Sequence, residues 1–286
     1  MLRSVCPRAV AAAGALLVAA SCSPGPPADP VAARLEEADR IIASVVEPVP
    51  GAPSTADEGR PGRYEPVPGI EPPVRQFVVG DEEGPARPGI VLVHTRWGLD
   101  AGMRDLARRF AERGFAVAVP DLFEGVVATS RISSEELVAG VGEERAIAIL
   151  RAAVEALGAR EGVDAERIGL LGISVGGIWG LRFAETHGGV AAIACDTTLL
   201  PDDPEAFPRI GVPLLLAVCD QRAAFDGAAR DRIRRAAEQA GVPFEMAVIQ
   251  GCGTDLFDSR AIGFNAVSEQ EAFERVAAFF AARLGG

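Results

Sequence analysis

Residues 172–177 read Gly-Ile-Ser-Val-Gly-Gly, a pattern typical of a serine nucleophile on a tight turn. The apolar run 168–173 leads into Ser174, and the two glycines after it open a helical segment. Glycines on both sides allow the strained turn that lifts a serine hydroxyl above a sheet. The alternative is a glycine-rich turn with an incidental serine, but the placement between a strand and a helix favours the nucleophile. A dinucleotide-binding turn would need glycine at position 174.

A serine hydroxyl is a weak nucleophile unless a nearby base removes its proton. In one large group of serine enzymes, an acid and then a histidine follow the serine along the chain. Asp220, at the end of an apolar run, suits the acid. The histidine is missing, because His94 and His187 are the only two and none follows His187. The sequence therefore predicts a nucleophile whose base is not evident.

The charge and composition of the chain argue against several classes of partner and of chemistry. The net charge is −12 over 286 residues, which argues against nucleic acid or an anionic membrane surface as an electrostatic partner. All basic residues are arginine, so no lysine can act as a base or form a Schiff base. No cysteine or histidine group has metal-ligand spacing. We expect neither a metal nor a cofactor.

Residues 1–22 resemble a bacterial lipoprotein export signal. Two arginines precede an apolar stretch, residues 9–20, that is too short for a permanent membrane span. Small residues then lead to Cys22, which would be lipidated, although Ala19 stands where leucine is usual. The alternative is ordinary signal cleavage nearby. The prediction is an exported protein of the cell envelope with a lipid anchor in the membrane.

Residues 23–73 are rich in proline, glycine and small residues, which predicts a tether. Within it, apolar residues at helical spacing over 31–46 predict a short amphipathic helix. Residues 74–286 are expected to form one folded domain.

From residue 74 onward, short apolar runs alternate with longer helical patterns. The expected strands are 74–79, 90–94, 116–120, 168–173, 190–195, 214–219 and 244–249. The expected helices are 103–113, 134–157, 177–186, 227–240 and 269–284. This alternation predicts an α/β fold with a mostly parallel central sheet and helices on both faces. Ligands bind such sheets at the carboxyl ends of the strands. The arginine groups 104–113 and 230–235 are interpreted as solvated helix faces rather than binding patches.

Two further segments carry a resemblance to the dienelactone hydrolase family of the α/β-hydrolase fold. Residues 88–94 and the following Trp-Gly-Leu at 97–99 are similar to that family's strand and loop after His-Glu. Residues 114–123, which end in Pro-Asp-Leu-Phe, are similar to its next strand. The resemblance covers about residues 85–284. It implies hydrolysis of a small ester or lactone, with the oxyanion held by the backbone N–H groups of Val175 and Arg96.

The sequence departs from the family pattern at three positions. Ser174 replaces the usual cysteine, and Thr95 replaces the glutamate that manages the cysteine thiol, so these two changes are consistent with each other. Asp220 matches the family's acid. Thr254 stands where the family has its histidine, so the base position is vacant.

Other residues are weaker candidates for the base. His187 is predicted at the far end of the helix after Ser174. His94 ends the strand next to the serine strand, where it either shapes the oxyanion loop or serves as a relocated base; the first role is favoured. A free aspartate side chain has a pKa of about 4, so Asp220 and Asp255 are expected to be poor at removing a serine proton.

Three cysteines lie in the folded part. Cys219 and Cys252 end neighbouring strands in this topology, which suggests a disulfide between the acid loop and the vacant base loop. Two free buried thiols are an equally good interpretation. Cys195 would then be the unpaired third.

Two functions follow from these observations. Ser174 and Asp220 favour a hydrolase that acts on a small ester or lactone, with impaired activity. The vacant position 254 favours an inactive, envelope-tethered protein that binds a ligand or partner. The sequence does not indicate an oligomeric state.

Overall fold

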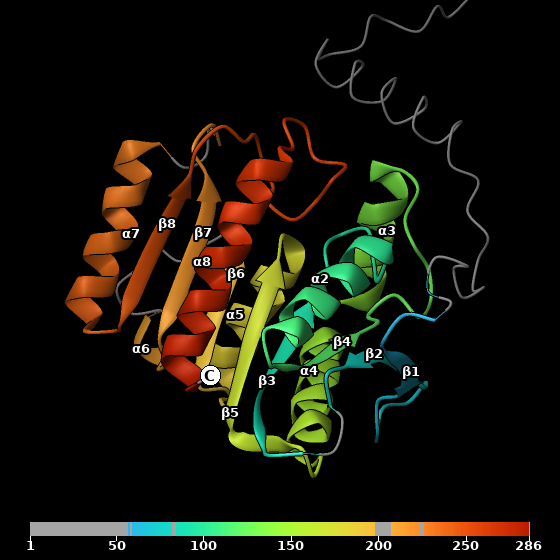
Figure 1. Ribbon diagram of the computed structural model, residues 1–286. Helices are drawn as coiled ribbons and strands as arrows, with labels where there is room; N and C mark the ends of the chain where they lie inside the picture. Colours follow the sequence, from blue (N-terminus) through green and yellow to red (C-terminus); the bar gives the residue numbers. More distant parts are fainter. Residues whose placement is uncertain (1–56, 58, 82–83, 198–206, 223–225, 286) are drawn as a thin grey trace, which may run out of the picture.

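An eight-stranded sheet forms the centre of the molecule (Figure 1). The computed structural model describes residues 57, 59–81, 84–197, 207–222 and 226–285. The sheet has the order β1-β2-β4-β3-β5-β6-β7-β8. Its strands are β1 (Arg63–Pro66), β2 (Arg75–Val79), β3 (Arg87–Val93), β4 (Ala116–Pro120), β5 (Val163–Ile173), β6 (Ala192–Asp196), β7 (Leu214–Cys219) and β8 (Phe244–Ile249). Strands β3 to β8 are parallel, and β1 and β2 add an antiparallel edge.

Helices cover both faces of this sheet. They are α2 (Ala101–Glu112), α3 (Arg131–Val141), α4 (Glu143–Gly158), α5 (Val175–Thr186), α6 (Phe207–Ile210), α7 (Gly227–Ala240) and α8 (Ala266–Leu284). Successive strand residues point to opposite faces, so Leu170 packs in the core under α4 and α5 while Leu171 packs in the core under α2 and α8. Burial on both faces explains the continuous apolar runs of the strands. The predicted α/β-hydrolase fold is confirmed.

Most expected elements are present, and three strands have the expected bounds: β4, β7 and β8. The expected helix 134–157 is two helices. Gly142 ends α3 with φ 69°, a conformation that glycine adopts without strain, and α4 starts at the next residue. The short helix α6 was not expected, because four residues are too few to show a helical period.

The expected boundary between tether and domain is wrong. Strand β1 lies inside the segment assigned to the tether and pairs with β2 along its whole length, from Arg63 opposite Val78 to Pro66 opposite Arg75. An edge strand pairs on one side only and tolerates proline. A short edge strand such as β1 therefore has a sequence that resembles a linker. The domain therefore includes β1 and, among the described residues, extends back at least to Asp57, which pairs with Arg104 and Arg108 of α2.

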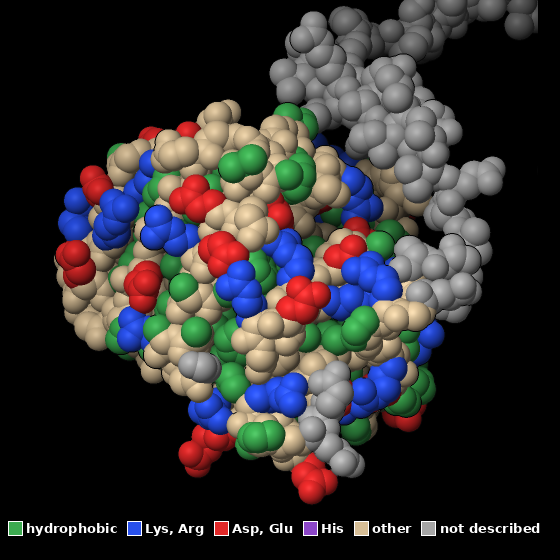
Figure 2. Space-filling model, viewed as in Figure 1, with side chains coloured by type: hydrophobic (Ala, Val, Ile, Leu, Met, Phe, Trp, Pro, Cys, Tyr) green, Lys and Arg blue, Asp and Glu red, His purple; other side chains and the backbone are tan. Residues whose placement is uncertain are grey.

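The interpretation of the α2 arginines as a solvated face is also wrong for two of them. Arg104 and Arg108 are 6% and 5% exposed, because the segment before β1 folds over them. Asp57 binds both, at 2.7 Å from Arg104 and 2.6 Å from Arg108. On the face that α2 and α8 cover, acidic and basic side chains alternate rather than segregate (Figure 2). Of the second group, Arg232, Arg234 and Arg235 are exposed as expected.

The suggested disulfide is present between Cys219 and Cys252, whose Cα atoms are 5.2 Å apart. Cys219 is the last residue of β7 and pairs in register with Ile249 of β8, so the sheet itself brings the two cysteines together. Cys195 is free and buried. The bond therefore ties the residue before Asp220 to the loop that follows β8.

The predicted anchor at Cys22 and the predicted helix 31–46 lie outside the described residues. Within the residues that the structure describes, no helix has the length and apolar character to cross a membrane.

Candidate active site

Ser174 stands at the carboxyl end of β5, immediately before α5. Its backbone has φ 56° and ψ −117°, a conformation that side-chain-bearing residues rarely adopt. Two hydrogen bonds hold it there: the Ser174 N–H donates to the Asp196 carbonyl at 2.6 Å, and the Gly177 N–H donates to the Ser174 carbonyl at 3.1 Å. Strain maintained by its surroundings in this way is typical of functional turns.

Three glycines make the turn sterically possible. A Cβ on Gly172 would lie 2.5 Å from the Gly176 carbonyl oxygen, and one on Gly177 would lie 2.8 Å from Cβ of Thr197. A Cβ on Gly176 would overlap the backbone at the end of β3, including the His94 carbonyl oxygen at 2.6 Å. The turn can therefore sit against β3 and β6 only without these side chains.

We expect Gly176→Ala to destabilise the protein by about 1–3 kcal/mol, because the added methyl group meets backbone atoms that cannot move aside. Gly140→Ala is the matched control, since a Cβ there meets nothing within 4 Å. That helical substitution should be neutral or stabilising by up to about 1 kcal/mol. Urea unfolding of both variants checks the difference, and equal effects would show that the close approach is not limiting.

Two backbone N–H groups are available to a developing oxyanion. In the part of the chain that the structure describes, the N–H groups of Val175 and Arg96 have no hydrogen-bond partner. Val175 is the first residue of α5, where the helix dipole favours negative charge. The loop that carries Arg96 is held by Thr95, whose hydroxyl accepts from the Trp97 N–H at 3.2 Å. Both predicted oxyanion donors are therefore free to bind an oxygen.

His94 is fully buried and is held by the backbone on both sides of its ring. Nε2 accepts from the Leu122 N–H at 3.1 Å, which leaves Nδ1 to donate to the Thr95 carbonyl at 2.7 Å. Burial lowers the pKa of His94, so the imidazole is neutral at neutral pH. No ring lone pair remains for the Ser174 proton. This geometry supports the role of shaping the oxyanion loop rather than that of a relocated base.

His187 lies where the sequence places it, at the C-terminal cap of α5. It stacks on Phe183, and the helix separates it from Ser174 by about 18 Å at 1.5 Å per residue.

Asp220 directly follows β7, as expected for the acid, but its carboxylate accepts hydrogen bonds from backbone N–H groups. It accepts from the N–H groups of Gly251 at 2.9 Å and Cys252 at 3.4 Å. Thr254, where the sequence predicts a vacant base position, is exposed. Two residues further on, the Leu256 N–H donates to the Asp196 carboxylate at 2.6 Å, which connects this loop to the end of β6.

The far part of the same loop is bound to the oxyanion loop. Asp258 accepts from the Trp97 indole N–H at 2.5 Å, and the Arg260 guanidinium lies 4.5 Å from the centre of that indole and pairs with Asp100. Burial raises the pKa of Asp258. The loop after β8 is therefore held at its start, middle and end.

Asp196 and Arg222 are residues that the sequence analysis missed. Asp196 ends β6 with no exposure, and Arg222, 7% exposed, pairs with Asp196 at 3.2 Å and with Asp255 at 2.9 Å. The available signal was a charged residue at the carboxyl end of an apolar run. The strand was expected to end one residue earlier, at Cys195.

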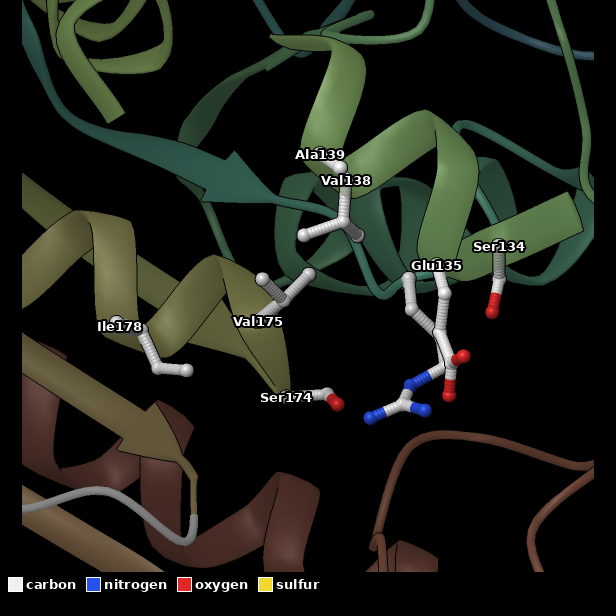
Figure 3. Close-up of a pocket in the computed structure, with 8 residues that line it drawn as sticks. Ser134, Glu135, Val138, Ala139, Ser174, Val175 and Ile178 are labelled. Carbon is white, nitrogen blue, oxygen red and sulfur yellow. The ribbon is translucent and has the colours of Figure 1, made fainter. Parts of the chain in front are cut away.

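A cavity of about 360 Å³ adjoins the nucleophile (Figure 3). Its apolar wall comes from α3 and α5, and Ser174 and Glu135 extend toward the same space. The lining residues are Arg96, Ser134, Glu135, Val138, Ala139, Ser174, Val175 and Ile178. A small, partly apolar molecule fits beside the hydroxyl. Across the described residues, no group of three or more acidic, histidine or cysteine side chains is arranged to hold a metal.

Comparison with known proteins gives a family and a fold. The sequence model of the dienelactone hydrolase family matches residues 75–284. The protein usf of Aquifex pyrophilus is 29% identical over 103 residues, which span 34% of this chain and 45% of that protein. The match thus covers less than half of that relative.

Solved structures show the same fold. A dienelactone hydrolase-like promiscuous phosphotriesterase from metagenomic libraries superposes with a TM-score of 0.68 at 19% identity, over 78% of this chain and 99% of that chain. A dienelactone hydrolase from Anabaena variabilis has a TM-score of 0.58 at 18% identity, over 78% and 98%.

Proposed function

The chain belongs to the dienelactone hydrolase family, and on that premise we propose that it hydrolyses a small carboxylic ester or lactone with Ser174 as nucleophile. The observation that carries the proposal is the strained Ser174 backbone beside two unpaired N–H groups, those of Val175 and Arg96. Acyl transfer needs such a pair, because negative charge develops on the carbonyl oxygen as the serine adds.

The reaction proceeds in two stages. The Ser174 hydroxyl oxygen bonds to the carbonyl carbon while a base takes its proton, and the two N–H groups hold the oxyanion. The bond from the carbonyl carbon to the alcohol oxygen then breaks, and that oxygen takes up the proton; the alcohol departs from an ester, whereas in an opened lactone it stays attached to the acyl group. Water then adds to the carbonyl carbon of the acyl-serine, and the acid is released as the Ser174 oxygen regains a proton. Val138 and Ile178 give the cavity beside Ser174 apolar walls.

The cavity favours small substrates. Its volume of about 360 Å³ lies at the lower end of the range for ligand sites, which is about 300–1,000 Å³. Val138, Ala139 and Ile178 suit a short apolar group, and Arg96 and Glu135 make the opposite side polar.

We expect Ser174→Ala to reduce hydrolysis of 4-nitrophenyl acetate by at least about tenfold, because the covalent route is lost. A fluorophosphonate should add to Ser174 in the wild type and not in the variant, as mass spectrometry of the labelled peptide will show. Equal hydrolysis by both proteins together with no labelling at Ser174 would contradict the proposal.

The second candidate function is binding without turnover. The exposed side chain of Thr254 favours it, since no imidazole stands between Asp220 and Ser174. An envelope-tethered domain of this kind would bind a small ester in the same cavity. Absence of labelling at Ser174, with the fold intact, would support this function.

A further inference from the structure

A buried charge cluster lies beside the nucleophile at the carboxyl end of the sheet. Asp196, Arg222 and Asp255 form it, from the end of β6, the segment after β7 and the loop after β8. Asp196 is the strand neighbour of Ile173, and its carbonyl accepts the Ser174 N–H. The cluster thus spans the region between the acid loop and the serine, where a histidine would have to reach.

Burial of these charges is unfavourable for the stability of the fold, which suggests that the cluster has a functional role. Asp196 has no exposure and Arg222 has 7%, and a buried ion pair often stabilises a fold less than apolar residues of similar size would. The cluster also holds two carboxylates against one guanidinium. Its third hydrogen bond, from the Leu256 N–H to Asp196, leaves each carboxylate oxygen of Asp196 with one donor. Each oxygen can accept a second.

The charges around Asp196 favour a carboxyl group that binds and releases a proton near neutrality. Burial, and then the negative charge of Asp255, raise the pKa of Asp196 to about 7, although Arg222 opposes the rise. The thiol of Cys195 is the titratable neighbour on the same strand, and burial raises its pKa so that it remains neutral. A base works best when its pKa lies near the working pH.

We propose that Asp196 is the general base for Ser174 and that Arg222 and Asp255 position it in the place of the missing histidine. This inference rests on the proposed function, since it needs Ser174 to act as nucleophile. The Asp196 carboxylate accepts the proton directly or through one water molecule as the serine oxygen bonds to the carbonyl carbon. The same proton then passes to the oxygen of the leaving group. In the second stage, water gives its proton to Asp196 as it attacks the acyl-serine, and that proton passes to the Ser174 oxygen as the bond from the carbonyl carbon to that oxygen breaks.

The test follows the rate at which a fluorophosphonate labels Ser174 in the full-length protein as a function of pH. The wild-type rate should rise with pH, with a midpoint near the pKa of about 7 at Asp196, because only the ionised carboxylate accepts a proton. Asp196→Asn should label at least about tenfold more slowly, since general base catalysis contributes about 10²–10⁴. In Asp196→Asn, the labelling rate should also no longer increase with pH around neutrality.

Asp81→Asn is the matched control. The side chain of Asp81 is 4% exposed and pairs with Arg63 and Arg160, but Asp81 follows the antiparallel strand β2 and so lies at the opposite edge of the sheet. Its variant should keep the wild-type rate and pH midpoint. A folded Asp196→Asn protein that labels like Asp81→Asn would overturn the inference and leave the role of Ser174 intact.

Arg222→Gln gives a second, independent result if Asp196→Asn does not fold. Loss of the guanidinium removes the charge that lowers the pKa of Asp196, so the labelling midpoint should move to higher pH. An unchanged midpoint would overturn the inference, as would a wild-type rate that does not vary with pH. If wild-type Ser174 is not labelled at all, the proposed function fails instead.

Discussion

Thr254→His is expected to raise hydrolysis of 4-nitrophenyl acetate by roughly ten- to a thousandfold. The sequence resemblance predicts that position 254 corresponds to the family histidine, and an imidazole is a better base for a serine than a carboxylate that is already bound by an arginine. Loss of the histidine from a complete triad costs about a millionfold, which bounds what its return could add.

The structure explains why the gain will be partial. The loop around Thr254 is held on one side by the disulfide at Cys252 and on the other by the Leu256 N–H on Asp196. The backbone is therefore ordered, but the side chain of residue 254 is exposed. A displacement of a catalytic group by about 1 Å can lower the reaction rate about a hundredfold.

Thr254→Gln is the matched control, because it adds a polar side chain that cannot take a proton. The gain should be absent from this control, and adding Ser174→Ala to Thr254→His should abolish it. Equal activity of Thr254→His and Thr254→Gln would show that an imidazole at 254 does not reach Ser174. Because His94 shapes the oxyanion loop, a loss of wild-type activity in His94→Ala is expected without a role for His94 as the base.

Removal of the disulfide is expected to lower the free energy of unfolding by about 3–4 kcal/mol. Cys219 and Cys252 are 33 residues apart, so the bond closes a loop of intermediate length and restricts the unfolded chain. Urea unfolding of Cys219→Ala/Cys252→Ala, compared with the oxidised wild type, measures the loss.

Reducing agent separates the bond from the packing of the two side chains. It should destabilise the wild type and Cys195→Ala by similar amounts and leave the double variant unchanged, because Cys195 is free. If the oxidised and reduced wild-type proteins unfold at the same urea concentration, the bond has no stabilising effect.

The sequence predicts the sheet well because burial on both faces imposes a pattern that few other structures share. Strand β7 is a continuous apolar run with the expected bounds, β8 also has the expected bounds, and the register of the two strands explains the Cys219–Cys252 pair. Edge strand β1 was missed, because its residues are largely exposed and need not be apolar. Arg104 and Arg108 were misjudged because Asp57, which buries their charge, lies far away in the sequence.

The sequence alone determined the α/β-hydrolase fold, the turn that presents Ser174 and the absence of a histidine after it. Each of these is local: a run of apolar residues, a set of glycines, or a residue type at one position. Tertiary structure alone decided what surrounds the serine. Asp196, Arg222 and Asp255 come from three separate segments, and no short-range pattern links a strand end to two loop residues. They meet because parallel strands end at one edge of the sheet, and the raised pKa of Asp196 depends on burial, which only the packed fold creates.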